Sequence, residues 1–194
     1  MRLLLASKSP RRRQLLSELG YPIEFINLDV DEHVAPGTPA SATAELLARR
    51  KAEDCPAEAI ATDDILVAAD TVVVLDDRVL GKPADRNQAL AMLHALAGKR
   101  HTVYTGVCLR TQDRAVSFTE KTDVFFRPLS VDEIAFYVDT YRPYDKAGAY
   151  GIQEWIGMVG ISRIEGCYYN VMGLPVARVY EKIKLLEAEG NLKG

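Results

Sequence analysis

The sequence predicts an α/β protein with a mixed, twisted sheet flanked by helices around a central cleft. Three observations support this fold class. Segments of helix and strand character alternate along the chain. The run 66–75 is apolar and largely β-branched, as in a strand that is buried on both faces. Residues 101–126 contain two strand-like segments separated by a turn. We expect one domain over 1–194, built as two lobes that share the cleft.

The first third of the chain contains two short apolar segments and two helical ones. The expected elements are strands at 3–6 and 23–27, a helix at 10–19 and a helix from Pro39 to Ala52. Ser9 suits the N-cap position of the first helix, Pro10 its first turn, and Gly20 the position just past its end.

The middle of the chain has the clearest strand signals. The expected strands are 66–75, 79–80, 101–109 and 115–126, and the last two form an antiparallel pair. Asp76, Asp77 and Arg78 form a tight turn, and Asp85 caps a helix that Gly98 closes.

The last third begins with a capping box, in which Ser130 and Glu133 open a helix. The apolar segment 158–164 predicts another strand, and 166–175 predicts a turn-rich connection. A final amphipathic helix begins at Val176 and fades into Glu189-Gly190-Asn191.

Composition and charge exclude several classes of protein. The 194 residues are 48% hydrophobic and 26% charged, with a net charge of −3, which argues against a general nucleic-acid binder. Three widely spaced cysteines indicate reduced core thiols in a cytoplasmic protein. The apolar run 3–6 is too short for a signal peptide, and no segment approaches the length of a membrane span.

Asp70 is the one carboxylate within the apolar run 66–75. An ionised carboxylate is costly in such surroundings unless a cation, a hydrogen-bond donor or solvent meets it. Two interpretations remain open at this point. Asp70 either lies at the strand end and bonds to local backbone, or it faces a working cleft.

Basic residues occupy two unusual places. Arg11, Arg12 and Arg13 fill the first helical turn, where acidic residues are favoured, so either an anion binds there or the turn is a solvated basic surface. Lys51 lies one turn beyond Leu47, near the buried face of its helix, where a lysine stem commonly snorkels to solvent.

The carboxylate and basic side chains of the sequence favour phosphoryl transfer. The chain has no Walker-type loop, no G-x-S-x-G elbow and no Cys–His pair in a useful context. It does have Asp70 and Glu32 among scattered lysines and arginines. Carboxylates can hold a hard divalent ion, and cations offset the charge of a polyphosphate.

Five motifs in order resemble the Maf family and together cover residues 3 to about 180. They are Ser7-x-Ser9-Pro10-Arg11-Arg12, Ala69-Asp70-Thr71, Gly81-Lys82-Pro83, the block 145–153 that begins Asp145-Lys146-Ala147-Gly148, and Val171-Met172-Gly173-Leu174-Pro175. The resemblance implies the fold that this family shares with the ITP/XTP (Ham1) pyrophosphatases. It also implies a nucleoside triphosphate pyrophosphatase, which cuts between the α and β phosphates, and a link to septum formation and arrest of cell division.

The resemblance assigns roles to individual residues. Arg11, Thr71 and Gln153 match the specificity positions of members that act on dTTP, UTP and modified pyrimidine nucleotides. Asp70 is implied as the general base, and Glu32 with Asp70 as ligands of Mg²⁺ or Mn²⁺. The residues expected to hold the phosphates are Ser7, Ser9, Arg11, Arg12, Lys51, Lys82 and Lys146.

The chain departs from the family pattern after Gln153, where Glu154-Trp155-Ile156-Gly157 replaces a glycine-rich continuation. Trp155 either stacks on a ligand or packs outward. The alternatives for function are a pyrophosphatase for another noncanonical or methylated nucleotide, such as 7-methyl-GTP, or a non-catalytic nucleotide-binding regulator. The expected partner is a small nucleotide rather than nucleic acid or membrane, and a homodimer remains an alternative to a monomer.

Overall fold

The computed structural model describes residues 1–28, 30–31, 33–35 and 37–191, and within them it is an α/β protein. Its seven-stranded mixed sheet has the strand order β2-β1-β3-β5-β6-β7, with β4 paired to β3. The predicted fold class, a mixed sheet flanked by helices, is therefore confirmed. The strands are β1 (Leu3–Ala6), β2 (Ile23–Ile26), β3 (Ile65–Leu75), β4 (Arg78–Leu80), β5 (Arg100–Arg110), β6 (Ala115–Phe126) and β7 (Ile161–Glu165).

The helices alternate with these strands along the chain. They are α1 (Pro10–Ser17), α2 (Ala40–Glu53), α3 (Arg86–Leu96), α4 (Val131–Tyr141), α5 (Trp155–Gly160), α6 (Tyr168–Met172) and α7 (Val176–Asn191). Two short 3₁₀ helices, η1 (Ala57–Ala59) and η2 (Ala147–Ala149), complete the set. Strand β1 pairs in parallel with both β2 and β3, whereas β4 runs antiparallel to β3 and β7 antiparallel to β6.

The chain divides into two compact units, which we describe separately. Unit 1 comprises Met1–Asp70, Thr105–Glu120 and Gly173–Gly194, and unit 2 comprises Thr71–Tyr104 and Lys121–Met172. Among the described residues, none of the helices combines the length and the apolar composition that crossing a membrane requires.

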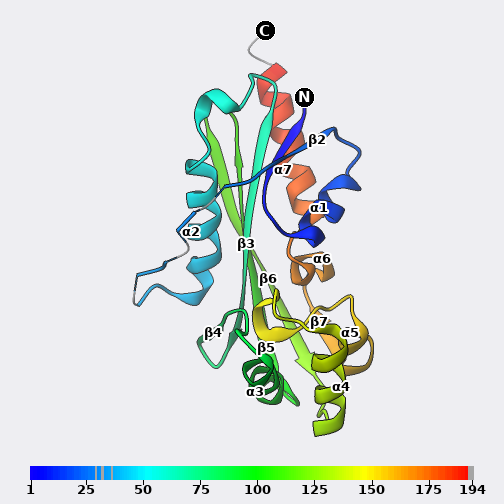
Figure 1. Cartoon of the computed structure of the whole chain (residues 1–194). Helices are drawn as coiled ribbons and strands as arrows, with labels where there is room; N and C mark the ends of the chain where they lie inside the picture. The colour runs from blue at the N-terminus through cyan, green and yellow to red at the C-terminus, as the bar shows by residue number, and fades with distance from the viewer. Residues whose placement is uncertain (29, 32, 36, 192–194) are drawn as a thin grey trace. The chain divides into compact units, whose positions relative to one another are not determined.

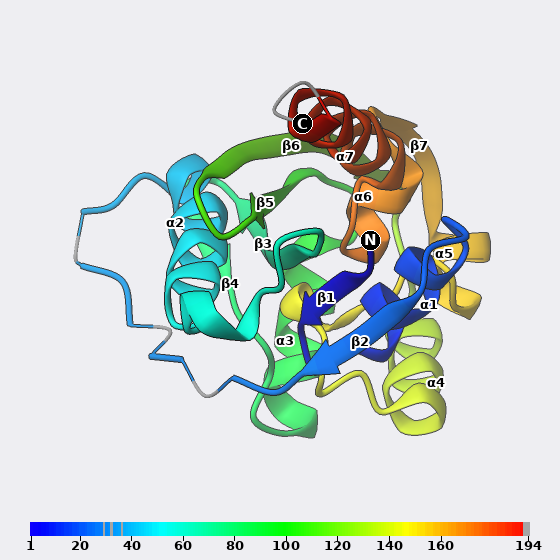
Figure 2. The same cartoon turned by 90° about the horizontal axis from the view of Figure 1, so that it is seen from above.

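Unit 1 builds its core between α2 and the strands. In Figure 1, α2 runs along one side of β3, and α1 lies on the other side. The buried side chains of this core include Leu4, Ala48, Ala52, Leu66 and Cys108. Figure 2 shows α7 alongside β6, where Arg178 of α7 donates to the Thr119 carbonyl at 2.8 Å.

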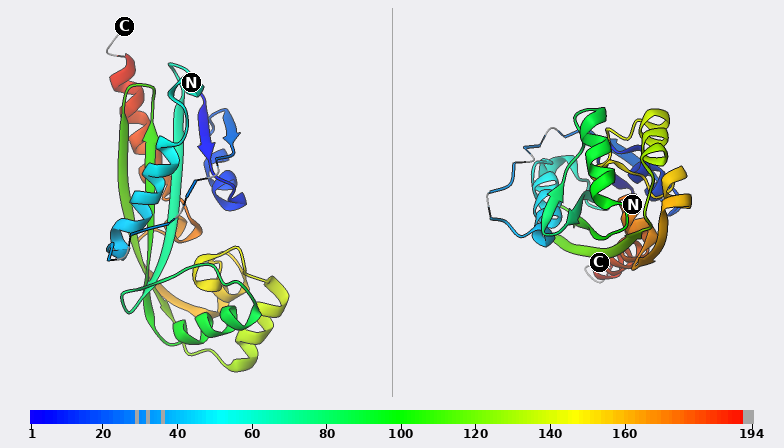
Figure 3. Two further views of the ribbon diagram at one scale, coloured as in Figure 1. Left: turned by 60° about the vertical axis from the view of Figure 1, so that its left-hand side comes forward. Right: turned by 90° about the horizontal axis from the view of Figure 1, so that it is seen from below.

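The core of unit 2 forms between helices and strand segments of that unit. Helices α3 and α4 lie against each other, as Figure 3 shows from a second direction. The core contains Leu93 and Leu96 from α3, Ile134 and Tyr137 from α4, and Val73 from β3. Ser130 and Glu133 form the predicted capping box at the start of α4. Arg127, which donates to Glu133, holds the pKa of that carboxyl down to about 2.

Two expectations for the last third are wrong. Residues 158–160, expected as part of a strand, belong to α5, and β7 begins only at Ile161. Residues 168–172, expected as turns, form α6. Both segments are short and lack helical periodicity over a useful length, so contacts with the rest of unit 2 decide their conformation.

The expectation of three core thiols holds for two of them. Cys55 and Cys108 are buried, while Cys167 is only half-buried, and all three are unbridged. Burial raises the pKa of the Cys108 thiol to about 11.

Candidate active site

Strand β3 is buried along its length except at two adjacent positions. Asp70 and Thr71, in its middle, are half-buried, while the other residues from Ile65 to Leu75 are buried. Asp70 therefore lies inside the strand rather than at its end. A half-buried carboxylate within an apolar strand requires a partner that compensates its charge.

That partner is Lys51, in the last turn of α2. The Lys51 ammonium donates to Oδ1 of Asp70 at 2.6 Å, a distance typical of a charge-assisted hydrogen bond. The side chains are 15% and 14% exposed. The Lys51 ammonium thus points toward Asp70. The expectation that the Lys51 side chain snorkels to solvent is wrong.

The position of α2 against the strands fixes this ion pair. At Gly106 of β5, a Cβ atom would lie 2.2 Å from the Glu45 backbone nitrogen and 2.3 Å from the Ala44 carbonyl carbon. Only glycine allows so close an approach of helix and strand. The Glu45 carboxylate also accepts bonds from Ser117 at 2.6 Å and Thr119 at 2.7 Å.

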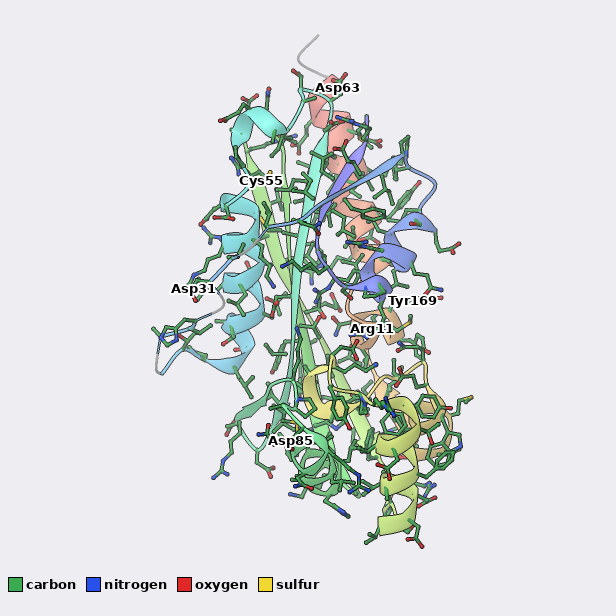
Figure 4. The ribbon with its side chains drawn as sticks, viewed as in Figure 1. Arg11, Asp31, Cys55, Asp63, Asp85 and Tyr169 are labelled. Carbon is green, nitrogen blue, oxygen red and sulfur yellow. The ribbon has the colours of Figure 1, made fainter. Side chains whose placement is uncertain are left out.

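The other end of α2 is fixed by Arg110. Its guanidinium donates to the carbonyl oxygens of Ala52 and Cys55, both at 2.6 Å. The Ala52 carbonyl is one of the last carbonyls of α2, which have no partner within the helix. Cys55 lies just beyond α2, as labelled in Figure 4. No local sequence pattern indicates this contact, because Arg110 is more than fifty positions from both carbonyls.

The N-terminal turn of α1 brings several predicted phosphate ligands together. Ser9 caps the helix by accepting from the Arg12 amide at 3.4 Å, and the Ser9 amide donates to Oγ of Ser7 at 3.2 Å. The Arg12 side chain donates to the Gly173 carbonyl at 2.8 Å, which joins the first and last motifs. Figure 4 labels Arg11 in the same turn.

Arg13 has a structural role in unit 1. Its guanidinium lies 4.6 Å from the centre of the Phe25 ring, a cation–π distance. The basic turn is thus neither wholly solvated nor wholly free for an anion.

Unit 2 joins two further motifs. The Gly148 amide donates to the Gly81 carbonyl at 3.0 Å, so the corner that carries Lys82 lies against the block that contains Lys146. Gly148 has a positive φ of 70°, and a Cβ there would meet Val73 at 3.0 Å. A glycine is required by both the backbone conformation and the close approach. Lys82 is exposed.

Lys146 is nearly buried in unit 2 between two carboxylates. Its ammonium lies 2.7 Å from Asp145 and 3.1 Å from Glu154, and its side chain is only 9% exposed. Glu154 also accepts from the Tyr137 hydroxyl. Burial raises the pKa of Tyr137, and its bond to Glu154 raises it further. The sequence pointed to Glu154 only as a departure from the family pattern.

The remaining specificity positions also lie in unit 2. Gln153 is exposed, and Thr71 follows Asp70 on β3. Trp155 packs edge-to-face on Phe136 of α4, with ring centres 4.9 Å apart, which favours the interpretation of a packing residue.

Of the two carboxylates expected to bind a divalent ion, the structure describes only Asp70. Glu32 lies outside the described residues, and within the described part of the chain no three His, Cys, Asp or Glu side chains group as metal ligands. Mg²⁺ commonly binds one or two carboxylates together with substrate phosphates and water. Asp70 offers a hard oxygen donor of the kind that such an ion binds.

Comparisons with known proteins agree with the motifs. The family model described as Maf-like protein matches residues 2–186. A "dTTP/UTP pyrophosphatase" of Parabacteroides distasonis is 47% identical over 184 residues, covering 94% of this chain and 95% of that protein. Proteins of the same name from Bacteroides thetaiotaomicron and Carboxydothermus hydrogenoformans are each 47% identical, over 185 and 186 residues. Each alignment covers 95% of this chain, and 95% and 98% of the respective relative.

Proposed function

The chain belongs to the Maf family, and we propose that it hydrolyses dTTP, UTP and modified pyrimidine nucleotides to the nucleoside monophosphate and pyrophosphate. It is then a nucleoside triphosphate diphosphatase, and cleansing of the nucleotide pool is the role that such an activity serves. The observation that carries this proposal is near full-length similarity to proteins named for the activity, at 47% identity in three genera. The link to septum formation is a separate proposal, which rests on the family resemblance alone.

Asp70 is the proposed general base. A water oxygen attacks the α phosphorus, the bond from that phosphorus to the bridging oxygen breaks, and pyrophosphate leaves. The proton of the water passes to the Asp70 carboxylate. The 2.6 Å bond from Lys51 supports this role, because it orients the carboxylate within an otherwise buried strand.

Charge compensation of the triphosphate falls to the basic and hydroxyl side chains. Phosphoryl transfer needs positioning and electrostatic stabilisation more than covalent help. The proposed phosphate ligands are Ser7, Ser9, Arg11, Arg12 and Lys51 of unit 1, and Lys82 and Lys146 of unit 2. The capped N-terminus of α1 supports the first group, since helix N-termini bind anions through backbone amides.

Recognition of the base is proposed for Arg11, Thr71 and Gln153. The exposed Gln153 side chain offers both a donor and an acceptor, which can match the edge of a uracil-type base.

We further propose that the reaction depends on Mg²⁺ or Mn²⁺ bound by Asp70 and Glu32. When bound, such an ion neutralises phosphate charge and polarises the scissile phosphoryl group.

A nucleotide panel with product identification tests the proposal. Purified protein with Mg²⁺ or Mn²⁺ is incubated with dTTP, UTP, CTP, GTP and 7-methyl-GTP, and the products are separated chromatographically. We expect monophosphate and pyrophosphate in equal amounts from dTTP and UTP, with slower turnover of the others. Preference for 7-methyl-GTP would favour another noncanonical nucleotide as substrate. Tight binding without turnover would favour a regulator.

A further inference from the structure

The segment Gly151–Glu154 of unit 2 carries Gln153, and its conformation depends on one carboxylate from within the segment. We propose that Glu154 is a positioning residue that holds Gln153 for recognition of the pyrimidine base. This inference rests on the proposed function, and it adds Glu154 to the residues on which recognition of the base depends.

The Glu154 carboxylate joins two other parts of unit 2. One oxygen accepts from the Tyr137 hydroxyl of α4, and the other lies 3.1 Å from the Lys146 ammonium. The Glu154 and Lys146 side chains are 19% and 9% exposed, so water competes weakly for this pair. These two contacts fix the direction of the Glu154 side chain. Glu154 directly follows Gln153 in the chain.

Tyr137 holds the other end of the same segment. Its side chain is fully buried, and its hydroxyl oxygen accepts a bond from the Gly151 amide at 3.0 Å. Gly151 and Glu154 therefore bond to one hydroxyl group, on either side of Ile152 and Gln153. The Glu154 amide also donates to the Gly151 carbonyl at 3.0 Å, which closes the turn.

The start of α5 packs directly against this turn. A Cβ atom at Gly157 would lie 1.8 Å from the Ile152 carbonyl oxygen, so helix and turn meet at backbone distance. Ile152 is buried, whereas Gln153 is exposed. The backbone of the segment is thus fixed by contacts on both sides, while the Gln153 side chain remains accessible to a ligand.

Base recognition by an amide is sensitive to its position. The uracil base of UTP has an acceptor oxygen at the position where the cytosine base of CTP has a donor amino group. A site that hydrogen-bonds one edge rejects the other only if its own polar group is held in place. Loosening the segment should therefore reduce the preference for UTP over CTP.

The role of Glu154 can be separated from that of Lys146. If loss of the Glu154 charge acted only through Lys146 and the phosphates, it would change the KM of every nucleotide by a similar factor. An effect through Gln153 depends on the base. The ratio of kcat/KM for UTP to that for CTP is therefore the informative quantity.

The experiment compares Glu154→Gln and Tyr137→Phe with the wild type. Glu154→Gln keeps the shape of the side chain and removes the ion pair, while Tyr137→Phe removes the shared hydroxyl. Asp139→Asn is the matched control, because it removes the carboxylate of an exposed ion pair with Arg86 in the same unit. Each protein is assayed for kcat and KM with UTP and CTP, and its thermal midpoint is measured.

We expect the UTP to CTP ratio to fall about tenfold in Glu154→Gln and in Tyr137→Phe, mainly through the KM for UTP, and to stay constant in the control. A folded Glu154→Gln variant with an unchanged ratio overturns the inference. If that variant does not fold, Tyr137→Phe decides in the same way. Wild-type protein that turns over nucleotides without preferring UTP overturns the role of Gln153, and absence of turnover overturns the proposed function itself.

Discussion

The close approach at Gly106 provides a way to disturb the Lys51–Asp70 pair without changing either residue. In Gly106→Ala, the new Cβ atom would lie 2.2 Å from the Glu45 nitrogen, whereas 3.4 Å is an ordinary contact. The clash is with backbone, which cannot rotate away. Helix α2 must therefore withdraw from β5 by about 1 Å, and overpacking of this kind costs about 1–3 kcal/mol of stability.

The same shift acts on the Lys51–Asp70 pair, for which we propose a part in catalysis. Lys51 lies on α2, and its ammonium is 2.6 Å from Asp70, so a withdrawal of this size takes the pair to the limit of hydrogen bonding. Misplacement of a catalytic group by 1 Å can cost about 100-fold in rate. We expect kcat/KM for UTP to fall about 10- to 100-fold, with a decrease in the thermal midpoint of about 3–10 °C.

Pyrophosphate release, measured well below the thermal midpoint, separates the loss of rate from unfolding. Gly160→Ala serves as the control, because the atoms nearest to its Cβ would belong to the side chains of Ile156 and Leu129, both at 3.3 Å. Those side chains can adjust, so we expect activity close to the wild type. Wild-type turnover together with wild-type melting in Gly106→Ala would show that this contact does not set the position of Lys51.

Three further predictions concern pH, thiol chemistry and metal. Burial lowers the pKa of His101 to about 4 from an ordinary 6.5. The unfolded chain then binds more protons between these pH values, and stability falls by up to about 3 kcal/mol as the pH drops through them. Urea titrations at several pH values measure this loss, which should shrink in His101→Phe. The half-buried Cys167 should react with a thiol reagent in the folded protein before the buried Cys55 and Cys108, by mass spectrometry of labelled peptides. EDTA should abolish UTP hydrolysis, and added Mg²⁺ should restore it; full activity in EDTA would contradict a role of Asp70 as a metal ligand.

Much of the fold follows from local signals that the structure retains. Ser9, Asp85 and Ser130 each cap the helix that the sequence predicts for them. The errors at 158–160 and 168–172 arise where the segments are too short for periodicity to distinguish helix from strand. In these places, packing within unit 2 outweighs local preference.

The sequence indicates a candidate site residue only where that residue is unusual in its local sequence. Asp70 is unusual because a charge interrupts an apolar strand, and that signal is present in the sequence. Its partner Lys51 is nineteen positions away, and no spacing rule connects a helix to a strand across that distance. The contacts of Glu154 with Tyr137 and Lys146 are likewise tertiary, so the sequence could mark Glu154 as different without indicating its role.

The proposed reaction requires the Asp70 carboxylate to activate water for attack on the α phosphorus of a pyrimidine nucleoside triphosphate. Single-turnover hydrolysis of UTP by Asp70→Asn, with Mg²⁺ present and UMP and pyrophosphate both quantified, tests this role. We expect a rate at least about 100-fold below the wild type, in a variant that is folded by circular dichroism. A near-normal rate of UMP formation would contradict it.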